Sequence, residues 1–314
     1  MLLKGTENTG AEIVVPGSVA NLGGGFDTLG VAVQIYLRAR ILEVREDGGG
    51  RLTVTRSTPP VPGGNALERA FALAVSRTGR TAPSVTVEVA SDIPMAAGLG
   101  SSAAATVAGL RVFEQVTRPL TDHEILALAT EVEGHADNAA PALFGGFTSV
   151  VADEEHHPVA LHWTWPDELR LVVATPSMKL ATAKARAALP ESMPRRDAIY
   201  NMQRVLSLVH ALECREYDRL REAVRDRWHQ PARSALVPVL REVLALQDPD
   251  VFGSFLSGAG PSVALMACRH FDRLEQVLSS IYERAGVPVV VRTLSVHRAA
   301  ALVGAGAPTV GRTA

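Results

Sequence analysis

One short stretch constrains this chain more than any other, the segment SDIPMAAGLGSSAAATVAGL at residues 91 to 110. It joins a predicted strand to a predicted helix through small, mostly neutral residues. Gly98 and Gly100 permit backbone dihedrals that would strain other residues, so successive N–H groups can converge on one point. The helix begins at Ser101 or Ser102, and its unpaired N–H groups and positive dipole end face the same point. The stretch therefore predicts an anion site, with phosphate as the natural occupant.

Other phosphate-binding loops fit this segment less well. Its Gly98, Gly100 and Ala103 satisfy the spacing G-x-G-x-x-A of dinucleotide-binding folds, but a second helix follows where that fold needs a strand ending in an acid. The sequence has no Gly-Lys-Ser/Thr, so the segment is not a Walker A loop, and the protein-kinase signatures are absent. A plain glycine turn with a serine cap on a buried helix stays an alternative.

Composition indicates a folded protein of two medium-sized domains. The 314 residues are 47% hydrophobic and 20% charged, and the net charge of -2 gives no electrostatic footprint for nucleic acid. The first residues lack the apolar core of a signal peptide, and no apolar run approaches the roughly 20 residues that cross a bilayer. We therefore expect a cytoplasmic protein that binds neither nucleic acid nor membrane. Two cysteines far apart in sequence predict neither a disulfide framework nor a zinc site.

Apolar patterns predict mixed α and β structure. Strands are expected at 12–15, 31–44, 84–90, 147–152, 169–176 and 287–296, with two short strands within 256–267. Helices are expected at 66–78, 102–116, 122–133, from 182 to about 247, and at 271–285. The segment from 152 to 166 is polar and irregular, and it predicts a boundary between two domains, 1–164 and 165–314.

Three glycine-containing stretches resemble, in order and spacing, the three motifs of the GHMP small-molecule kinases. They are PGSVANLGGGFDTLGVAV (16–33), IPMAAGLGSSAAA (93–105) and LSGAGPSVALMA (256–267). Within that superfamily, ANLGGGFDTLG, EGHADNAAPALFGGF (133–147) and HQPARSALVP (229–238) resemble the homoserine kinases. A departure is Gly24, where the family usually has proline. The resemblance implies an α+β, two-domain GHMP kinase fold, with an N-terminal domain like domain 2 of ribosomal protein S5 and a ferredoxin-like C-terminal domain.

The resemblance also implies a reaction. ATP would phosphorylate the side-chain hydroxyl of L-homoserine to give O-phospho-L-homoserine, a step of threonine biosynthesis, with Mg²⁺ as cofactor and a homodimer as the assembly. Two alternatives stay open. One is a GHMP kinase acting on another small alcohol, such as an isoprenoid or a sugar, and the other is a catalytically silent nucleotide-binding protein.

The resemblance assigns ATP to the loop and the start of its helix. The residues are Pro94, Met95, Ala96, Ala97, Gly98, Leu99, Gly100, Ser101, Ser102, Ala103 and Ala104. Asn65, at the start of another predicted helix, is a candidate for reading adenine, and a helix N-cap is an equal alternative.

A carboxylate and a hydroxyl are expected to hold the Mg²⁺. Ser102 is the favoured hydroxyl, with Ser101 as its alternative. Glu131 and Glu133 lie two apart on a predicted helix and cannot point the same way, so at most one is a ligand. The resemblance favours Glu131, with Glu133 as the rival and a solvated helix face as the third possibility.

Homoserine carries a carboxylate, an ammonium and a hydroxyl, so a selective pocket needs a cation, an anion and a group that reads the hydroxyl. The resemblance places Arg186 and Arg233 at the carboxylate. It places Asp27 at the ammonium and makes Asn21 a second substrate contact. Surface salt bridges are the alternative for the arginines, and turn roles are the alternative for Asn21 and Asp27.

The resemblance places the segment GHADN at the reacting hydroxyl. It favours Asn138 as the group that orients the hydroxyl, leaves a general-base role for Asp137 open, and makes His135 a further candidate for substrate contact. A capping or turn role is the alternative for all three. Gly258 and Gly260 lie between two short strands, where the backbone can approach the substrate, although an ordinary tight turn also fits.

Overall fold

The first of two β-sheets is built around the long strand β2 (Leu29–Arg45). The computed structural model describes residues 9–298 and the backbone of 302–304. β2 pairs antiparallel with β1 (Glu12–Ala20) over most of its length, with β5 (Phe147–Ala152) near its start and with β4 (Ser84–Ser91) near its end. Three strands complete the sheet, namely β3 (Leu52–Thr58) parallel to β4, β6 (Pro158–Trp163) beside β5, and β11 (Leu302–Gly304) beside β1.

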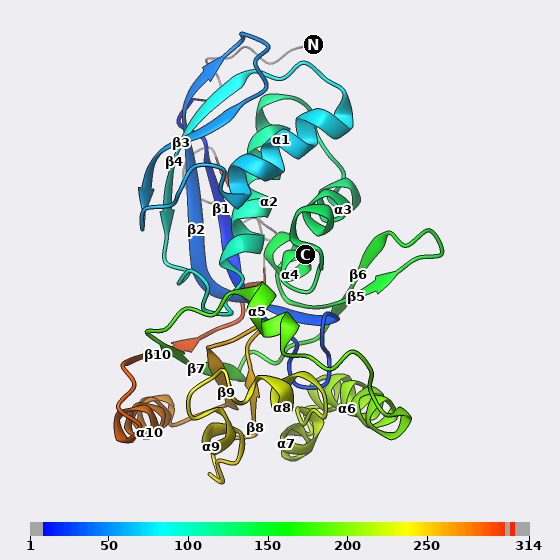
Figure 1. Cartoon of the computed structure of the whole chain (residues 1–314), viewed down its shortest axis with the longest axis vertical. Coiled ribbons are helices and arrows are strands. Elements are labelled where there is room, and N and C mark those ends of the chain that lie inside the picture. The colour runs from blue at the N-terminus through cyan, green and yellow to red at the C-terminus, as the bar shows by residue number, and fades with distance from the viewer. Residues whose placement is uncertain (1–8, 299–301, 305–314) are drawn as a thin grey trace, which may run out of the picture.

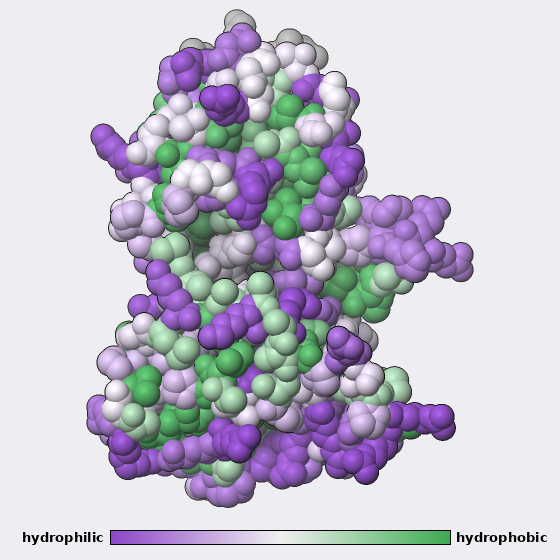
Figure 2. All heavy atoms as spheres, in the orientation of Figure 1, coloured by the Kyte–Doolittle hydropathy of each residue, from purple (hydrophilic) through white to green (hydrophobic). Residues whose placement is uncertain are grey.

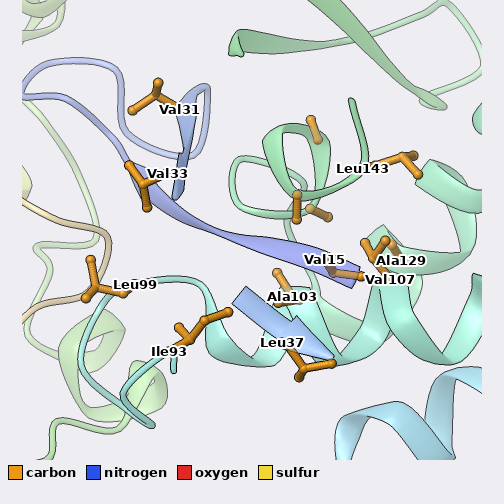
Figure 3. Close-up of a cluster of buried hydrophobic side chains, with 14 of the residues drawn as sticks. Val15, Val31, Val33, Leu37, Ile93, Leu99, Ala103, Val107, Ala129 and Leu143 are labelled. Carbon is orange, nitrogen blue, oxygen red and sulfur yellow. The ribbon is translucent and has the colours of Figure 1, made fainter. Parts of the chain in front are cut away.

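Four helices cover one face of this sheet (Figure 1). They are α1 (Ala66–Thr78), α2 (Ser101–Val116), α3 (Asp122–Glu133) and α4 (Ala139–Phe144). Helix α2 lies in the centre of this layer and is buried on almost every side, which its run of small residues permits. In Figure 3, Val15 and Leu37 of the sheet lie beside Ala103 and Val107 of α2 in one hydrophobic core.

The second sheet is antiparallel and has the order β10-β7-β9-β8. Its strands are β7 (Arg170–Pro176), β8 (Gly253–Leu256), β9 (Val263–Ala267) and β10 (Val289–Leu294). Helix α10 (Phe271–Arg284) packs against it through one apolar face. Five shorter elements and one long helix surround it: α5 (Thr182–Ala187), α6 (Arg195–Glu213), a 3₁₀ turn (Tyr217–Arg219), α7 (Leu220–Ala223), α8 (His229–Arg233) and α9 (Leu240–Leu244).

Most of the predicted elements are confirmed, often to within a residue or two. β3 was not predicted, and β6 lies in the segment expected to be irregular, because it pairs at the sheet margin and half of its residues face solvent. The region expected to be helical from 182 to about 247 contains five helices and a 3₁₀ turn. Pro190 and Pro194 lie between the first two helices and Pro238 lies before the last, since proline cannot donate the helical hydrogen bond.

The chain leaves the first sheet at Trp163 and enters the second at Arg170, and β11 returns to the first sheet. The domain boundary near residue 164 stays a prediction. Among the helices of the described residues, none is long and apolar enough to cross a membrane.

Candidate active site

A cavity of about 230 Å³ lies where the glycine loop and the start of α2 meet α5, α8 and the turn between β8 and β9. It gathers sixteen of the residues predicted from sequence, which are Asn21, Asp27, Ala96, Ala97, Gly98, Gly100, Ser101, Ser102, Ala103, His135, Asp137, Asn138, Arg186, Arg233, Gly258 and Gly260. Ala259, between the predicted Gly258 and Gly260, also lines it, and three more lining residues were not predicted, namely Phe26, Leu180 and Thr182. Glu133, the rival metal ligand, also lines it.

Four hydrogen bonds hold the glycine loop in place, and each uses a carbonyl of the loop. The N–H groups of Ser18, Leu180 and Ser262 donate to Leu99, Ala96 and Ala97 at 3.1 Å, and the Ser257 hydroxyl donates to Gly98 at 2.6 Å. None of the four uses a loop N–H, so the amides are left for a ligand. This arrangement fits the predicted anion site.

Gly98 and Gly100 both have the left-handed backbone that the sequence predicted, with φ of +78° and +70°. A Cβ at Gly98 would lie 2.3 Å from the Ser257 carbonyl oxygen, and one at Gly100 would lie 2.1 Å from the Ser18 hydroxyl. Gly100 is the N-cap of α2, and no side chain caps this helix. The serine-cap alternative is therefore wrong, and the first amides of α2 stay open to an anion.

An apolar pocket of about 210 Å³ adjoins the cavity across the start of α2. Ser101 and Ser102 line both, and Met95 and Asn65 line the pocket. Asn65 is also the N-cap of α1, since its side chain accepts a hydrogen bond from the N–H of Glu68 at 3.2 Å. Both roles foreseen for Asn65 are thus compatible with its position.

Three residues of the predicted ATP set line neither the cavity nor the adjoining apolar pocket. Pro94 and Leu99 line a separate hollow on the other side of the loop, and Leu99 is buried in the core (Figure 3). Ala104 is fully buried within α2. None of the three lines the cavity.

Glu131 and Glu133 point in different directions, as their spacing predicted, and the geometry favours Glu133 over the expected Glu131. Glu131 is exposed and forms an ion pair with Arg77 outside the cavity. Glu133 Oε1 accepts hydrogen bonds from the hydroxyls of Ser102 at 2.8 Å and Thr106 at 2.6 Å. The structure thus brings Ser102 together with Glu133, because α3 turns that residue toward the start of α2.

Asp27 and Arg186 form a two-pronged ion pair inside the cavity. The guanidinium donates to both carboxylate oxygens, at 2.9 and 2.6 Å. The aromatic ring of Phe26 lies 5.4 Å from the Arg186 guanidinium carbon and 5.2 Å from that of Arg233. Phe26 therefore positions both cations, and Trp228 packs edge-on against it.

Arg233 is almost completely buried, so the surface salt-bridge alternative is wrong for this residue. It donates to the carbonyls of Ala185 at 3.2 Å and Gly258 at 3.1 Å, and it lies 3.3 Å from His229 Nδ1. Burial, together with the nearby Arg186, lowers the pKa of Arg233 to about 10. Burial also lowers the pKa of His229, so a neutral ring can accept from Arg233. No carboxylate engages Arg233 directly among the described residues, which leaves its charge available to an anionic ligand.

The segment GHADN is linked by hydrogen bonds to β1. Asp137 Oδ1 lies 2.5 Å from His135 Nδ1 and accepts from the Asn138 backbone N–H at 2.9 Å and its side-chain amide at 3.2 Å. The Ser18 hydroxyl donates to Asn138 Oδ1 at 2.9 Å. Asn138 is the N-cap residue of α4 and lies in a turn, but its side chain makes no capping hydrogen bond. Burial opposes the charged form of His135, but Asp137 outweighs it and raises the pKa of His135.

Asn21 joins the two sheets at the cavity floor. Its amide donates to the Gly258 carbonyl at 2.9 Å, and its Oδ1 accepts from the Asp27 N–H at 3.0 Å. Asn21 and Asp27 both have positive φ, of 74° and 53°, which costs free energy and is often retained at functional sites. Asn21 therefore has the turn role that was its alternative, and it also lines the cavity. The Gly258 carbonyl oxygen accepts the hydrogen bond from its side chain.

Comparison with known proteins decides the family. Residues 65–146 match the model of the GHMP kinase N-terminal domain, and residues 208–287 match that of the GHMP kinase C-terminal domain. A homoserine kinase of Persephonella marina is 35% identical over 91% of this chain and 96% of its own length, and one of Deinococcus radiodurans is 39% identical over 82% and 83%. The chain belongs to the GHMP kinase family, in its homoserine kinase branch.

The fold of the family is confirmed by solved structures as well. The crystal structure of a homoserine kinase from Cytophaga hutchinsonii superposes with a TM-score of 0.82, at 24% identity, covering 96% of this chain and 99% of the other. The predicted two-domain α+β GHMP kinase fold is therefore correct. Membership of a kinase family implies ATP as the phosphoryl donor and a small molecule as the acceptor.

Proposed function

We propose that this chain transfers the γ-phosphoryl group of ATP to the side-chain hydroxyl of L-homoserine. The observation that carries the proposal is the pairing of Asp27 with Arg186 beside the buried Arg233, in a cavity that adjoins the start of α2. A zwitterionic amino acid matches these charges, with its ammonium at Asp27 and its carboxylate between the two guanidinium groups. A mevalonate-like or sugar alcohol has no ammonium for Asp27.

ATP fits the two adjoining hollows. Its adenine would lie in the apolar pocket near Asn65 and Met95, and its phosphates would lie over the amides of the glycine loop and α2. Ser102 and Glu133 together offer the hydroxyl and carboxylate oxygens that Mg²⁺ prefers. When bound, Mg²⁺ neutralises charge on the transferring phosphate. The cluster of Asp27, His135 and Asp137 fits Mg²⁺ less well, because Arg186 already neutralises Asp27 and imidazole is a poorer ligand for this ion.

Asn138 suits the task of orienting the acceptor hydroxyl. Ser18 and Asp137 fix its side-chain amide from both ends, and the second amide hydrogen is left for a ligand. Asp137 is a weaker candidate for general base, since three groups already share its Oδ1. In the transfer, the hydroxyl oxygen bonds to the γ-phosphorus, the bond to ADP breaks and the hydroxyl proton is released.

An acceptor screen tests the function directly. ADP release is measured with homoserine, 4-hydroxybutyrate, 3-aminopropanol, mevalonate and galactose, and only homoserine should support rapid turnover. Asp27→Ala should raise the KM for homoserine by ~100-fold, because it removes a partly buried charge partner of the ammonium. Equal turnover with mevalonate or galactose would overturn the proposal, and silence with every alcohol would favour a nucleotide-binding protein. The homodimer and the cytoplasmic location stay predictions.

A further inference from the structure

The imidazole of His229, at the start of α8, is a buried titratable group that lines neither the cavity nor the adjoining apolar pocket. Hydrophilic side chains follow the lower edge of the molecule, where α7 and α9 lie (Figure 2), whereas His229 is 0% exposed. A buried ring must find its hydrogen-bond partners within the protein. Two partners are present, since Nε2 lies 2.7 Å from the Gly23 carbonyl oxygen and Nδ1 lies 3.3 Å from Arg233 Nη1.

These two partners decide which nitrogen of the ring carries the hydrogen. A carbonyl oxygen can only accept, so Nε2 donates to Gly23, and a carboxylate oxygen of Asp226 lies 3.6 Å from the same nitrogen. A guanidinium can only donate, so Nδ1 keeps its lone pair. Burial lowers the pKa of His229, and the cation of Arg233 adds to this effect against the opposing charge of Asp226. The ring is therefore neutral, with its hydrogen on Nε2.

The contact with His229 completes a set of acceptors on one side of the Arg233 guanidinium. Nε donates to the Ala185 carbonyl at 3.2 Å, and Nη1 donates to the Gly258 carbonyl at 3.1 Å and to His229. The two hydrogens of Nη1 are thus both engaged. Among the described residues, no acceptor engages Nη2, so its two hydrogens are left for a ligand in the cavity that Arg233 lines.

His229 also joins this arginine to the segment that carries Asp27. Gly23 and Asp27 both lie in the turn between β1 and β2, and Asp27 lines the cavity from that turn. A Cβ at Gly23 would lie 2.1 Å from the Val224 carbonyl oxygen, so the turn is packed directly against the segment that leads into α8. A neutral ring that donates to the turn and accepts from Arg233 fixes the cation of the cavity relative to its anion.

We propose that His229 is a positioning residue for the amino-acid end of the substrate, because it orients Nη2 of Arg233 toward the substrate carboxylate at a fixed distance from Asp27. The inference rests on the proposed function and adds a determinant of specificity to it. An α-amino acid carries its ammonium and carboxylate on one carbon, whereas a β-amino acid sets them one carbon further apart. A fixed spacing of Asp27 and Arg233 therefore selects the α-amino acid.

Two substitutions separate the two contacts of the ring. His229→Asn keeps an amide oxygen near the position of Nδ1 for Arg233, whereas His229→Gln keeps an amide N–H near the position of Nε2 for Gly23 and loses the acceptor for Arg233. His229→Gln should raise the KM for homoserine by ~30-fold, the value of a hydrogen bond to a charged group, with kcat within ~3-fold of wild type. His229→Asn should raise the same KM by only ~3-fold.

Selectivity is measured with 3-amino-5-hydroxypentanoate, a β-amino acid that keeps the hydroxyethyl arm of homoserine. The preference in kcat/KM for homoserine over this compound should fall ~10-fold in His229→Gln and stay near the wild-type value in His229→Asn. Thermal unfolding of both variants gives the comparison that a purely structural role requires, since KM would then follow Tm in both. His210→Gln, at an exposed histidine of α6, is the matched control and should change none of these values.

Long-range proton–nitrogen NMR of the histidine-labelled wild type at pH 7 needs no stable variant. The His229 signal, identified by its absence from the His229→Asn spectrum, should show the hydrogen on Nε2 alone. A hydrogen on Nδ1, a wild-type KM for homoserine in His229→Gln, or a KM that follows Tm in both variants would each overturn the proposal. A wild type that releases no ADP with homoserine would overturn the proposed function and this role together, while the NMR result would stand.

Discussion

The two glutamates near the end of α3 give the sharpest test of the proposed metal site. Glu133→Gln removes the negative charge that faces Ser102 and keeps the size and one oxygen of the side chain. Glu131→Gln makes the identical chemical change two residues away, where the carboxylate pairs with Arg77 at the surface. The two variants make the same chemical change on the same helix, one inside the cavity and one outside it, so Glu131→Gln is the matched control.

The structure separates the expected cost in stability from the expected cost in rate. Two hydroxyls donate to Glu133 Oε1 at 2.8 and 2.6 Å, and the carbonyl oxygen of glutamine can accept both. The loss of charge assistance then costs about 1 kcal/mol for each bond, or about 2 kcal/mol for the two, which corresponds to a Tm about 3 °C lower in a chain of this length. Loss of a preorganised contact to developing charge costs ~10²–10³-fold in kcat. The rate should therefore fall far more than the stability.

Steady-state ADP release at saturating homoserine, with Mg²⁺ titrated at fixed ATP, measures both parts of the effect. Glu133→Gln should lower kcat by ~100-fold or more and raise the Mg²⁺ concentration for half-maximal rate, while Glu131→Gln stays within ~2-fold of wild type. The reasoning fails if Glu133→Gln keeps the wild-type rate and Mg²⁺ dependence, or if Glu131→Gln is the slower of the two.

Three more predictions follow from the cavity. Asp137 raises the pKa of His135, so the stability that this pair adds is complete below pH 6.5 and is lost as the pH rises through the raised pKa. The difference in Tm between wild type and His135→Gln should therefore shrink across that pH range. Gly100→Ala should cost about 2 kcal/mol and abolish tight ATP binding in calorimetry, whereas Gly63→Ala, at an open position, should do neither. Arg186→Lys keeps the charge but not the fork, so the KM for homoserine should rise ~10-fold with kcat less affected.

The loop and its helix could be predicted from the sequence because their constraints are local. The need for left-handed backbone at Gly98 and Gly100 and the helix propensity of the alanines are properties of neighbouring residues. The αL cap at Gly134 and the start of α1 at Asn65 were predictable for the same reason. Most element boundaries are of this kind, which is why they agree with the structure to within a few residues.

The choice between Glu131 and Glu133 could not be made in the same way. Spacing on a helix shows that the two point apart, but the direction of each depends on how α3 packs against α1 and α2, which is a tertiary property. One local signal was available. The hydroxyls of Ser102 and Thr106 lie one turn apart on α2, and together they form a surface that one carboxylate can bridge.

Ser18 and Phe26 show a second limit of the sequence. Both lie within the motif at 16–33, yet neither carries a charge that would suggest a role in the site. Ser18 fixes Asn138 from a distance of 120 residues, and Phe26 lies between two arginines from other elements. Residues that position other residues are defined by their partners, so they emerge only when the fold brings the partners together.

The pairing of Asp27 with Arg186 bears on why the site would select a zwitterion. In the cavity the two charges neutralise each other, at 2.6 and 2.9 Å, beside an Arg233 whose charge is already held out of solvent. A ligand with both a carboxylate and an ammonium can separate the pair and give each member a new partner. A ligand that carries only a carboxylate or only an ammonium separates the pair but gives one of the two residues no new partner. The free energy cost of leaving that charge unpaired and partly buried exceeds the free energy gained from the new contact. Discrimination against 4-hydroxybutyrate and 3-aminopropanol should therefore come from the unpaired residue of the enzyme as much as from the missing group of the ligand.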